Sequence, residues 1–143
     1  MKTYATLLLA GTAFALAACG SDEVIVTEPV VDVVATDYTV YFGFDRADLT
    51  PVGAETVASA SNVATATGSS SVSVVGHTDT VGSVAYNQGL SEARAATVVG
   101  AMVGSGVNPA IITASGRSEL DLAVATADGV REARNRRVEI DVQ

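Results

Sequence analysis

Hydrophobic and polar positions alternate along four short stretches of this chain, at residues 38–44, 71–77, 111–114 and 138–142. Alternation with a period of two is typical of β-strands that bury one face. Two longer stretches, residues 52–67 and a second that begins between residues 83 and 86, repeat their apolar positions with a helical period. The order strand, helix, strand, helix, strand, loop, strand predicts an α/β (α+β) domain, with a four-stranded mixed sheet and two main helices on one face.

Local signals at the ends of these stretches agree with the assignment. Thr50 followed by Pro51 is typical of a helix N-cap with proline in the first turn, and Gly68 marks the end of that helix. The β-branched content of residues 71–77 places the second strand in the middle of the sheet. Residues 117–134 are polar and irregular, which predicts a long connection into the last strand.

The first 19 residues have the pattern of an export signal. Lys2 precedes an apolar run that is well short of the ~20 residues a membrane-spanning helix needs. The run ends in Leu16-Ala17-Ala18-Cys19, the pattern of a lipobox, where a bacterial lipoprotein is cleaved and acylated on cysteine with chains such as palmitate. Cys19 is the only cysteine, so no internal disulfide can form. We expect a chain lipidated at Cys19; the alternative is an ordinary signal peptide that leaves this thiol free or buried.

Residues 20–37 form an acidic, valine-rich tether, and residues 38–143 form the folded domain. Within the tether, residues 30–34 are open between an additional edge strand and an irregular segment. Gly20 directly follows Cys19, whereas an aspartate at that place resembles an inner-membrane retention signal of enteric bacteria. We therefore expect the anchor to lie in the outer membrane, on its periplasmic face.

The net charge of the chain limits which kinds of molecule it can bind. The chain has 8 basic and 16 acidic residues, for a net charge of −8. Loss of the signal segment removes the single lysine, so seven arginines remain against the same 16 acids, or −9. Such a chain disfavours nucleic acid as a partner and has no general attraction to polyanionic cell-wall polymers. Any binding to the wall must therefore come from a local, shaped pocket.

The most distinctive stretch is GHTDTVGSVAYNQGLSEARA at residues 76–95, which reads as a strand end, a polar loop and a helix. Six residues of that helix are expected on its buried face: Leu90, Ala93, Arg94, Thr97, Val98 and Ala101. Arg94, at the edge of this face, is expected to lean back toward the loop that carries Asp79. A guanidinium and a carboxylate placed in this way suit the ammonium and carboxylate of a free amino-acid end. The alternative is that Asp79 and Arg94 pair with each other and pin the loop to the helix.

The pattern G-H-T-D, Gly82 and N-x-x-L-S-x-x-R-A resembles the signature of the OmpA-like C-terminal domain, the module that holds bacterial outer membranes to peptidoglycan. A second match, N-R-R-V-E-I at residues 135–140, lies far from the first along the chain. The resemblance covers about residues 38–143. It implies that Asp79 and Arg94 bind the diaminopimelate residue of the stem peptide, so that replacing either with alanine removes most binding and leaves the fold intact.

The resemblance implies further contacts with the same ligand. Arg136, the first arginine of the triplet, is expected at the ligand's carboxylate end. Phe44 and Asp45 match the family's exit from its first strand, which lies along one wall of the ligand groove, and Asn87 belongs to the helix motif. Asp45 could instead be a turn carboxylate bonded to its own backbone. We expect Arg131 and Arg134 to lie in a solvated cationic patch, which is also the alternative for Arg136 and Arg137.

One departure from the family concerns the connection before the last strand. Residues 122–126 and Ala133 stand where related sequences often have proline, which leaves the rigidity of this connection open.

The predicted function is that of a lipoprotein that binds peptidoglycan without covalent chemistry and ties the outer membrane to the wall. The resemblance extends to the peptidoglycan-associated lipoproteins of the Tol system, which implies TolB and other Tol proteins as partners. The alternative is an OmpA-family lipoprotein with a protein partner or another structural role in the envelope. A wall hydrolase with His77 as base and Asp79 as its orienter is disfavoured, because the chain has one histidine, no G-x-S-x-G turn and no cluster suited to zinc. We therefore expect no enzyme activity and no cofactor.

Overall fold

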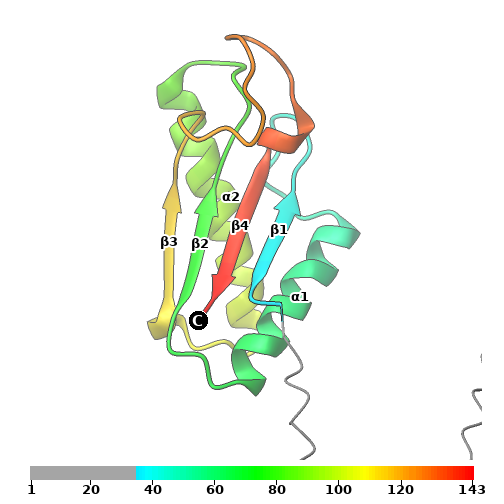
Figure 1. The fold of residues 1–143 in the computed structure, drawn as a ribbon, viewed down its shortest axis with the longest axis vertical. Coiled ribbons are helices and arrows are strands. Elements are labelled where there is room, and N and C mark those ends of the chain that lie inside the picture. The colour runs from blue at the N-terminus through cyan, green and yellow to red at the C-terminus, as the bar shows by residue number, and fades with distance from the viewer. Residues whose placement is uncertain (1–34) are drawn as a thin grey trace, which may run out of the picture. The chain divides into compact units, whose positions relative to one another are not determined.

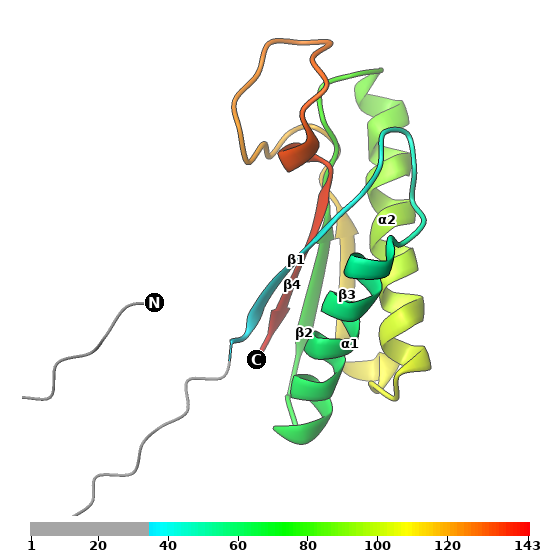
Figure 2. The ribbon, with the colours of Figure 1, turned by 90° about the vertical axis from the view of Figure 1, so that its right-hand side faces the viewer.

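The domain is a four-stranded sheet with two helices on one face (Figures 1 and 2). A computed structural model describes residues 35–143, so the expected signal segment, Cys19 and the open strand at residues 30–34 lie outside the described residues. The elements are β1 (Asp37–Tyr41), α1 (Pro51–Ala66), β2 (Val72–Gly76), α2 (Val84–Gly104), β3 (Ile112–Gly116) and β4 (Arg137–Val142). Within residues 35–143, no helix has both the length and the apolar character needed to cross a membrane.

The sheet is mixed, as predicted. Its strand order is β1-β4-β2-β3, with β2 and β3 parallel and β4 antiparallel to both of its neighbours. The second strand therefore lies inside the sheet, which confirms the prediction from its β-branched content. Because β1, β2 and β3 run in one direction, the segments that leave them meet the segment that enters β4 at one end of the sheet (top of Figure 1).

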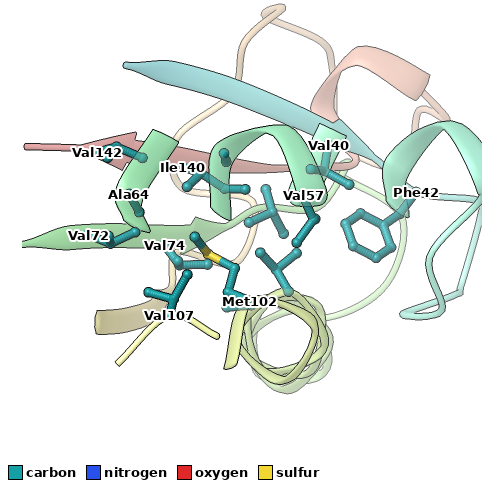
Figure 3. Packing of buried hydrophobic residues seen from close by; sticks show 14 residues of the cluster. Val40, Phe42, Val57, Ala64, Val72, Val74, Met102, Val107, Ile140 and Val142 are labelled. Carbon is teal, nitrogen blue, oxygen red and sulfur yellow. The ribbon is translucent and has the colours of Figure 1, made fainter. Parts of the chain in front are cut away.

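The core lies between the sheet and the two helices. Helix α1 packs on β1, and α2 packs on β2 and β3. The inward side chains of β4 are Val138, Ile140 and Val142, as the alternation predicts, and each is buried. In Figure 3 the side chains of the strands, such as Val74 and Ile140, point toward Val57 of α1 and Met102 of α2. This burial of apolar surface is the main stabilising contribution that holds the helices on the sheet.

Both helices begin at capping residues. Thr50 is the N-cap of α1, where its Oγ1 accepts a hydrogen bond from the Gly53 N–H at 3.0 Å, and Pro51 is the first helical residue. Ser83 caps α2 in the same way by accepting from the Tyr86 N–H at 3.1 Å. Each hydroxyl satisfies a backbone donor that has no partner inside the helix. The predicted starts of both helices are confirmed.

The buried face of α2 differs from the predicted one. Its buried residues are Asn87, Ser91, Arg94, Ala95, Val98 and Met102, whereas Ala93 is exposed. The cause lies in the sheet, where Gly76 and Gly116 are register partners on β2 and β3. A Cβ at Gly76 would overlap the backbone oxygen of Ser91, and one at Gly116 would lie 2.7 Å from the backbone N of Glu92. The helix lies so close to these strands that only small residues fit between them.

Two strand boundaries also differ from prediction. β1 ends at Tyr41 rather than at residue 44, because the chain turns after it: the Arg46 N–H donates to the Gly43 carbonyl, and Asp45 has a φ of 54°. β3 begins at Ile112 because Pro109–Ile111 forms a 3₁₀ turn. Neither shift moves a predicted site residue to another face of the domain.

Candidate functional site

A pocket of about 190 Å³ lies where the loops after β1 and β2 meet the first turns of α2. Its lining consists of Phe44, Asp45, Asp79, Val81, Gly82, Tyr86, Asn87, Leu90 and Arg94. Five of the six predicted binding residues therefore line one pocket, and the sixth, Arg136, contacts Asp79 from outside that lining. A larger hollow of about 300 Å³ between β1 and α1 has no charged side chain in its lining. Of these two hollows, only the first is lined by charged side chains, which are those of Asp45, Asp79 and Arg94.

Arg94 is fully buried, not at the edge of the helix face as predicted. Its Nε donates to the Arg46 carbonyl at 2.8 Å, Nη1 to the His77 carbonyl at 2.8 Å, and Nη2 to the Gly43 carbonyl at 3.1 Å. Burial lowers the pKa of this guanidinium to about 10, against the opposing effect of Asp79, so it stays charged at neutral pH. An arginine has five N–H donors, so one on each terminal nitrogen has no acceptor among the described residues.

Asp79 pairs with Arg136, and not with Arg94 as the alternative interpretation held. Its Oδ2 accepts from Arg136 Nη1 at 3.2 Å and from the Glu132 N–H at 3.3 Å, and its Oδ1 accepts from the Val81 N–H at 3.4 Å. A carboxylate offers about four acceptor positions, so three bonds leave one free. Asp79 and Arg94 therefore keep one acceptor and two donors between them for a molecule in the pocket.

Of the four arginines in the cationic patch, Arg131 and Arg134 are exposed, as a solvated patch requires, whereas Arg136 and Arg137 are not. Arg136 also donates through Nε to the Phe42 carbonyl at 3.2 Å, which ties β4 to the end of β1. Arg137 is buried and donates to Glu139 at 2.7 Å, and Arg134 pairs with Glu132 at 3.0 Å. The Cζ of Arg131 lies 3.8 Å from the centroid of the Phe44 ring. Each of the four arginines has its own contact, and only Arg131 and Arg134 are also exposed to solvent.

Asp45 and Asn87 have partners that their motifs do not reveal. Asp45 accepts a short hydrogen bond from the Tyr86 hydroxyl, instead of bonding to its own backbone. Asn87 donates to Glu119 Oε2 at 2.5 Å and to the Val81 carbonyl at 3.2 Å. Tyr86 and Glu119 were missed from sequence. Their partners lie 41 and 32 residues away along the chain, and no local pattern signals such contacts.

The connection between β3 and β4 is fixed without proline. The Thr80 hydroxyl donates to the Ala127 carbonyl at 2.7 Å and accepts from the Val130 N–H at 3.1 Å. The Asn135 amide makes two bonds to the backbone of Val124, at 2.8 and 2.9 Å. Side chains that hydrogen-bond loop backbone replace the stiffness that proline would give. The connection therefore holds its place over the loop after β2.

His77 lies on the opposite side of β2 from the helices, where Glu139 is its neighbour. Its ring is fully buried, and neither ring nitrogen has a hydrogen-bond partner; Nε2 is 3.8 Å from a Glu139 oxygen. The pairing of His77 with Asp79 that a hydrolase would need is not formed, because the carboxylate bonds elsewhere. Burial lowers the pKa of His77, and Arg137 acts in the same direction, while Glu139 and Asp121 oppose the shift.

This environment predicts a pH dependence of stability. A histidine whose pKa is lowered by folding binds its proton more readily in the unfolded chain, so the free energy of unfolding falls as pH drops below about 6.5. Between pH 7.5 and 5.5 the parent is therefore expected to lose stability, and His77 contributes to that loss. Urea unfolding at both pH values should show a smaller loss for His77→Gln than for the parent. An equal loss in the two proteins would contradict the assignment.

Comparison with known proteins places the chain in a family. The model of the OmpA family matches residues 41–136. Outer membrane protein A of Bordetella avium is 34% identical over 114 residues, which cover 80% of this chain and 59% of that protein. The chain spans only 30 to 59% of the length of the curated relatives that it matches.

Solved structures share the fold. The peptidoglycan-associated lipoprotein from Burkholderia pseudomallei superposes with a TM-score of 0.69 and 24% identity, over 74% of this chain and 90% of that one. At that identity the likeness concerns the fold alone. The cell wall anchor of the T6SS from Pseudomonas aeruginosa has a TM-score of 0.60 and 28% identity, over 74% of this chain and 79% of that one.

Proposed function

Because the chain belongs to the OmpA family, we propose that its domain is a non-catalytic module that binds peptidoglycan in the pocket between β1, β2 and α2. The observation that carries the proposal is the joint placement of Asp79 and Arg94 in one pocket, each with hydrogen-bonding capacity left over. The free acceptor of Asp79 suits an ammonium, and the two free donors of Arg94 suit a carboxylate.

The ligand that fits these groups is the end of an amino acid that carries both its ammonium and its carboxylate. In a peptidoglycan stem peptide, the free end of diaminopimelate has this chemistry. Arg94 is already fixed by three carbonyls, so its remaining donors are oriented before the ligand arrives and little side-chain freedom is lost on binding. Asn87 contributes indirectly, since it holds the loop that carries Asp79.

Attachment at the other end would come from lipid on Cys19. With the anchor in the outer membrane, the domain would reach the wall through the tether at residues 20–37. Two attachments on one chain raise the effective concentration of the second, so a weak pocket is sufficient for firm tethering. This arrangement is that of a peptidoglycan-associated lipoprotein, with TolB and other Tol proteins as further partners.

The test is sedimentation of residues 20–143 with purified peptidoglycan. Asp79→Asn removes the charge that accepts the ammonium and keeps the size of the side chain, and binding is expected to fall about tenfold or more. Glu55→Gln is the matched control: it removes one negative charge from the exposed side of α1, outside the pocket lining. Circular dichroism checks that each variant is folded.

Two results would contradict the proposal. Wall binding by folded Asp79→Asn that equals the parent's would remove the pocket assignment. A parent that stays in solution would remove the wall as ligand, and a protein partner would become the leading occupant of the pocket.

A further inference from the structure

Most arginines of the described residues are engaged within the protein. Of the seven arginines in residues 35–143, five have side-chain hydrogen bonds or ion pairs: Arg46, Arg94, Arg134, Arg136 and Arg137. Arg117 and Arg131 have neither among the described residues. Of these two, only Arg131 contacts the pocket lining, through the face of Phe44 at 3.8 Å. Arg131 is thus the one cation at the pocket whose five donors are all unused.

The backbone around Arg131 is held against the pocket. The Glu132 N–H donates to Asp79 Oδ2 at 3.3 Å, and the Val130 N–H donates to the Thr80 hydroxyl at 3.1 Å. The residues on both sides of Arg131 are therefore bonded to the loop that forms the pocket. The Arg131 side chain therefore starts from a backbone held by these bonds, and its guanidinium lies against the Phe44 ring.

Nearby carboxylates already have partners. Asp79 bonds to Arg136, Asp45 accepts from Tyr86, and Glu132 binds Arg134. The hydrogen bond from Arg134 holds the pKa of Glu132 at about 2, so this carboxylate stays charged and paired. An external anion at Arg131 therefore faces little competition from these side chains.

We propose that Arg131 is a second anion-binding residue of the pocket, which takes a carboxylate of the ligand other than the one at Arg94. A guanidinium stacked on an aromatic face keeps its N–H groups in the plane of the stack, free to bind a carboxylate in a two-pronged contact. The proposal rests on the proposed function and deepens it. It defines the ligand class as amino acids or peptides with a second carboxylate beyond the amino-acid end.

The test uses two ligands that differ only in that carboxylate, meso-diaminopimelate and D-lysine. Each presents a D-centre with an ammonium and a carboxylate to Asp79 and Arg94, and a second ammonium at its far end. Residues 20–143 are titrated with each ligand at 0.15 M salt and followed by NMR, because this salt screens the general attraction of an acidic protein for D-lysine. We expect the parent to bind diaminopimelate about tenfold more tightly than D-lysine.

In Arg131→Gln the affinity for D-lysine should stay unchanged and the preference for diaminopimelate should disappear. Arg117→Gln is the matched control, since it removes an equally unpaired arginine outside the pocket lining and should keep the preference. Arg131→Gln that retains the parent's preference would overturn the inference and leave the proposed function standing. Equal weakening of both ligands would also overturn it, because Arg131 would then act only through Phe44. A parent that binds neither ligand would reject the proposed function and the inference with it.

Discussion

Replacing Arg94 with alanine is expected to destabilise the domain by about 3 to 5 kcal/mol, in addition to abolishing binding. The side chain is fully buried, and three backbone carbonyls, at Gly43, Arg46 and His77, depend on it for a hydrogen bond. Without the guanidinium the Arg46 and His77 carbonyls lose their donor, the Gly43 carbonyl keeps only the Arg46 N–H, and a cavity opens between the loop after β1 and the end of β2. From sequence, Arg94 is expected to be removable without harm to the fold; its burial predicts the opposite.

Urea unfolding of residues 20–143 measures this effect. Arg134→Ala is the matched control, because that arginine is exposed and pairs only with its near neighbour Glu132 at the surface. Its loss should leave the free energy of unfolding nearly unchanged. Since small domains are stable by only about 5 to 15 kcal/mol, Arg94→Ala is expected to leave a marginal fold. Unchanged stability of Arg94→Ala would contradict the role of these three hydrogen bonds.

This double role bears on how the binding site is tested. Lost wall binding in Arg94→Ala would report a damaged pocket as readily as a missing contact. Asp79 is the more informative position, because Arg136 keeps its bond to the Phe42 carbonyl when the carboxylate becomes an amide, and the amide oxygen can still accept from the Glu132 N–H. Arg94 therefore mainly holds the pocket in shape, whereas Asp79 mainly supplies a negative charge to it.

The order of the elements could be predicted because its signals are local. Thr50 and Pro51 mark the start of α1, and alternation in residues 138–142 marks β4, from the neighbouring sequence alone. The face of α2 could not be predicted in this way. It is set by Gly76 and Gly116, which are 40 residues apart yet pair across β2 and β3 and admit the helix so closely that Ser91 must face them.

In the site, too, residues of a local motif could be predicted from sequence, and their distant partners could not. A motif at residues 76–95 identified Asp79, Asn87 and Arg94, and the pocket brings all three together. The partners of these residues could not be found, because the Asp79 contact with Arg136 spans 57 residues and Asn87 reaches Glu119 across 32. The strand order brings such pairs together, and the spacing of residues along the chain does not predict them.

A single methyl group at Gly76 should have an effect comparable with the loss of Arg94. In Gly76→Ala the new Cβ would overlap the backbone oxygen of Ser91, and backbone on both sides leaves no flexible side chain to move away. Helix α2 must therefore shift from the sheet, at an expected cost of about 3 kcal/mol or more. Gly100→Ala makes the same chemical change within α2 at a place where nothing lies within 4 Å of the new Cβ. It should be neutral or stabilise the domain by up to about 1 kcal/mol.

The measurement is urea unfolding of the two variants beside the parent, and equal stability of all three would contradict the close approach. The displacement also has a consequence for the site. Gly76 directly precedes His77, whose carbonyl accepts from Arg94, so moving α2 outward separates the guanidinium from its anchor. Folded molecules of Gly76→Ala should therefore bind peptidoglycan less well than the parent, although the substituted residue lies outside the pocket lining. The close approach of α2 to Gly76 and Gly116 thereby fixes the position of Arg94 in the pocket proposed to bind peptidoglycan.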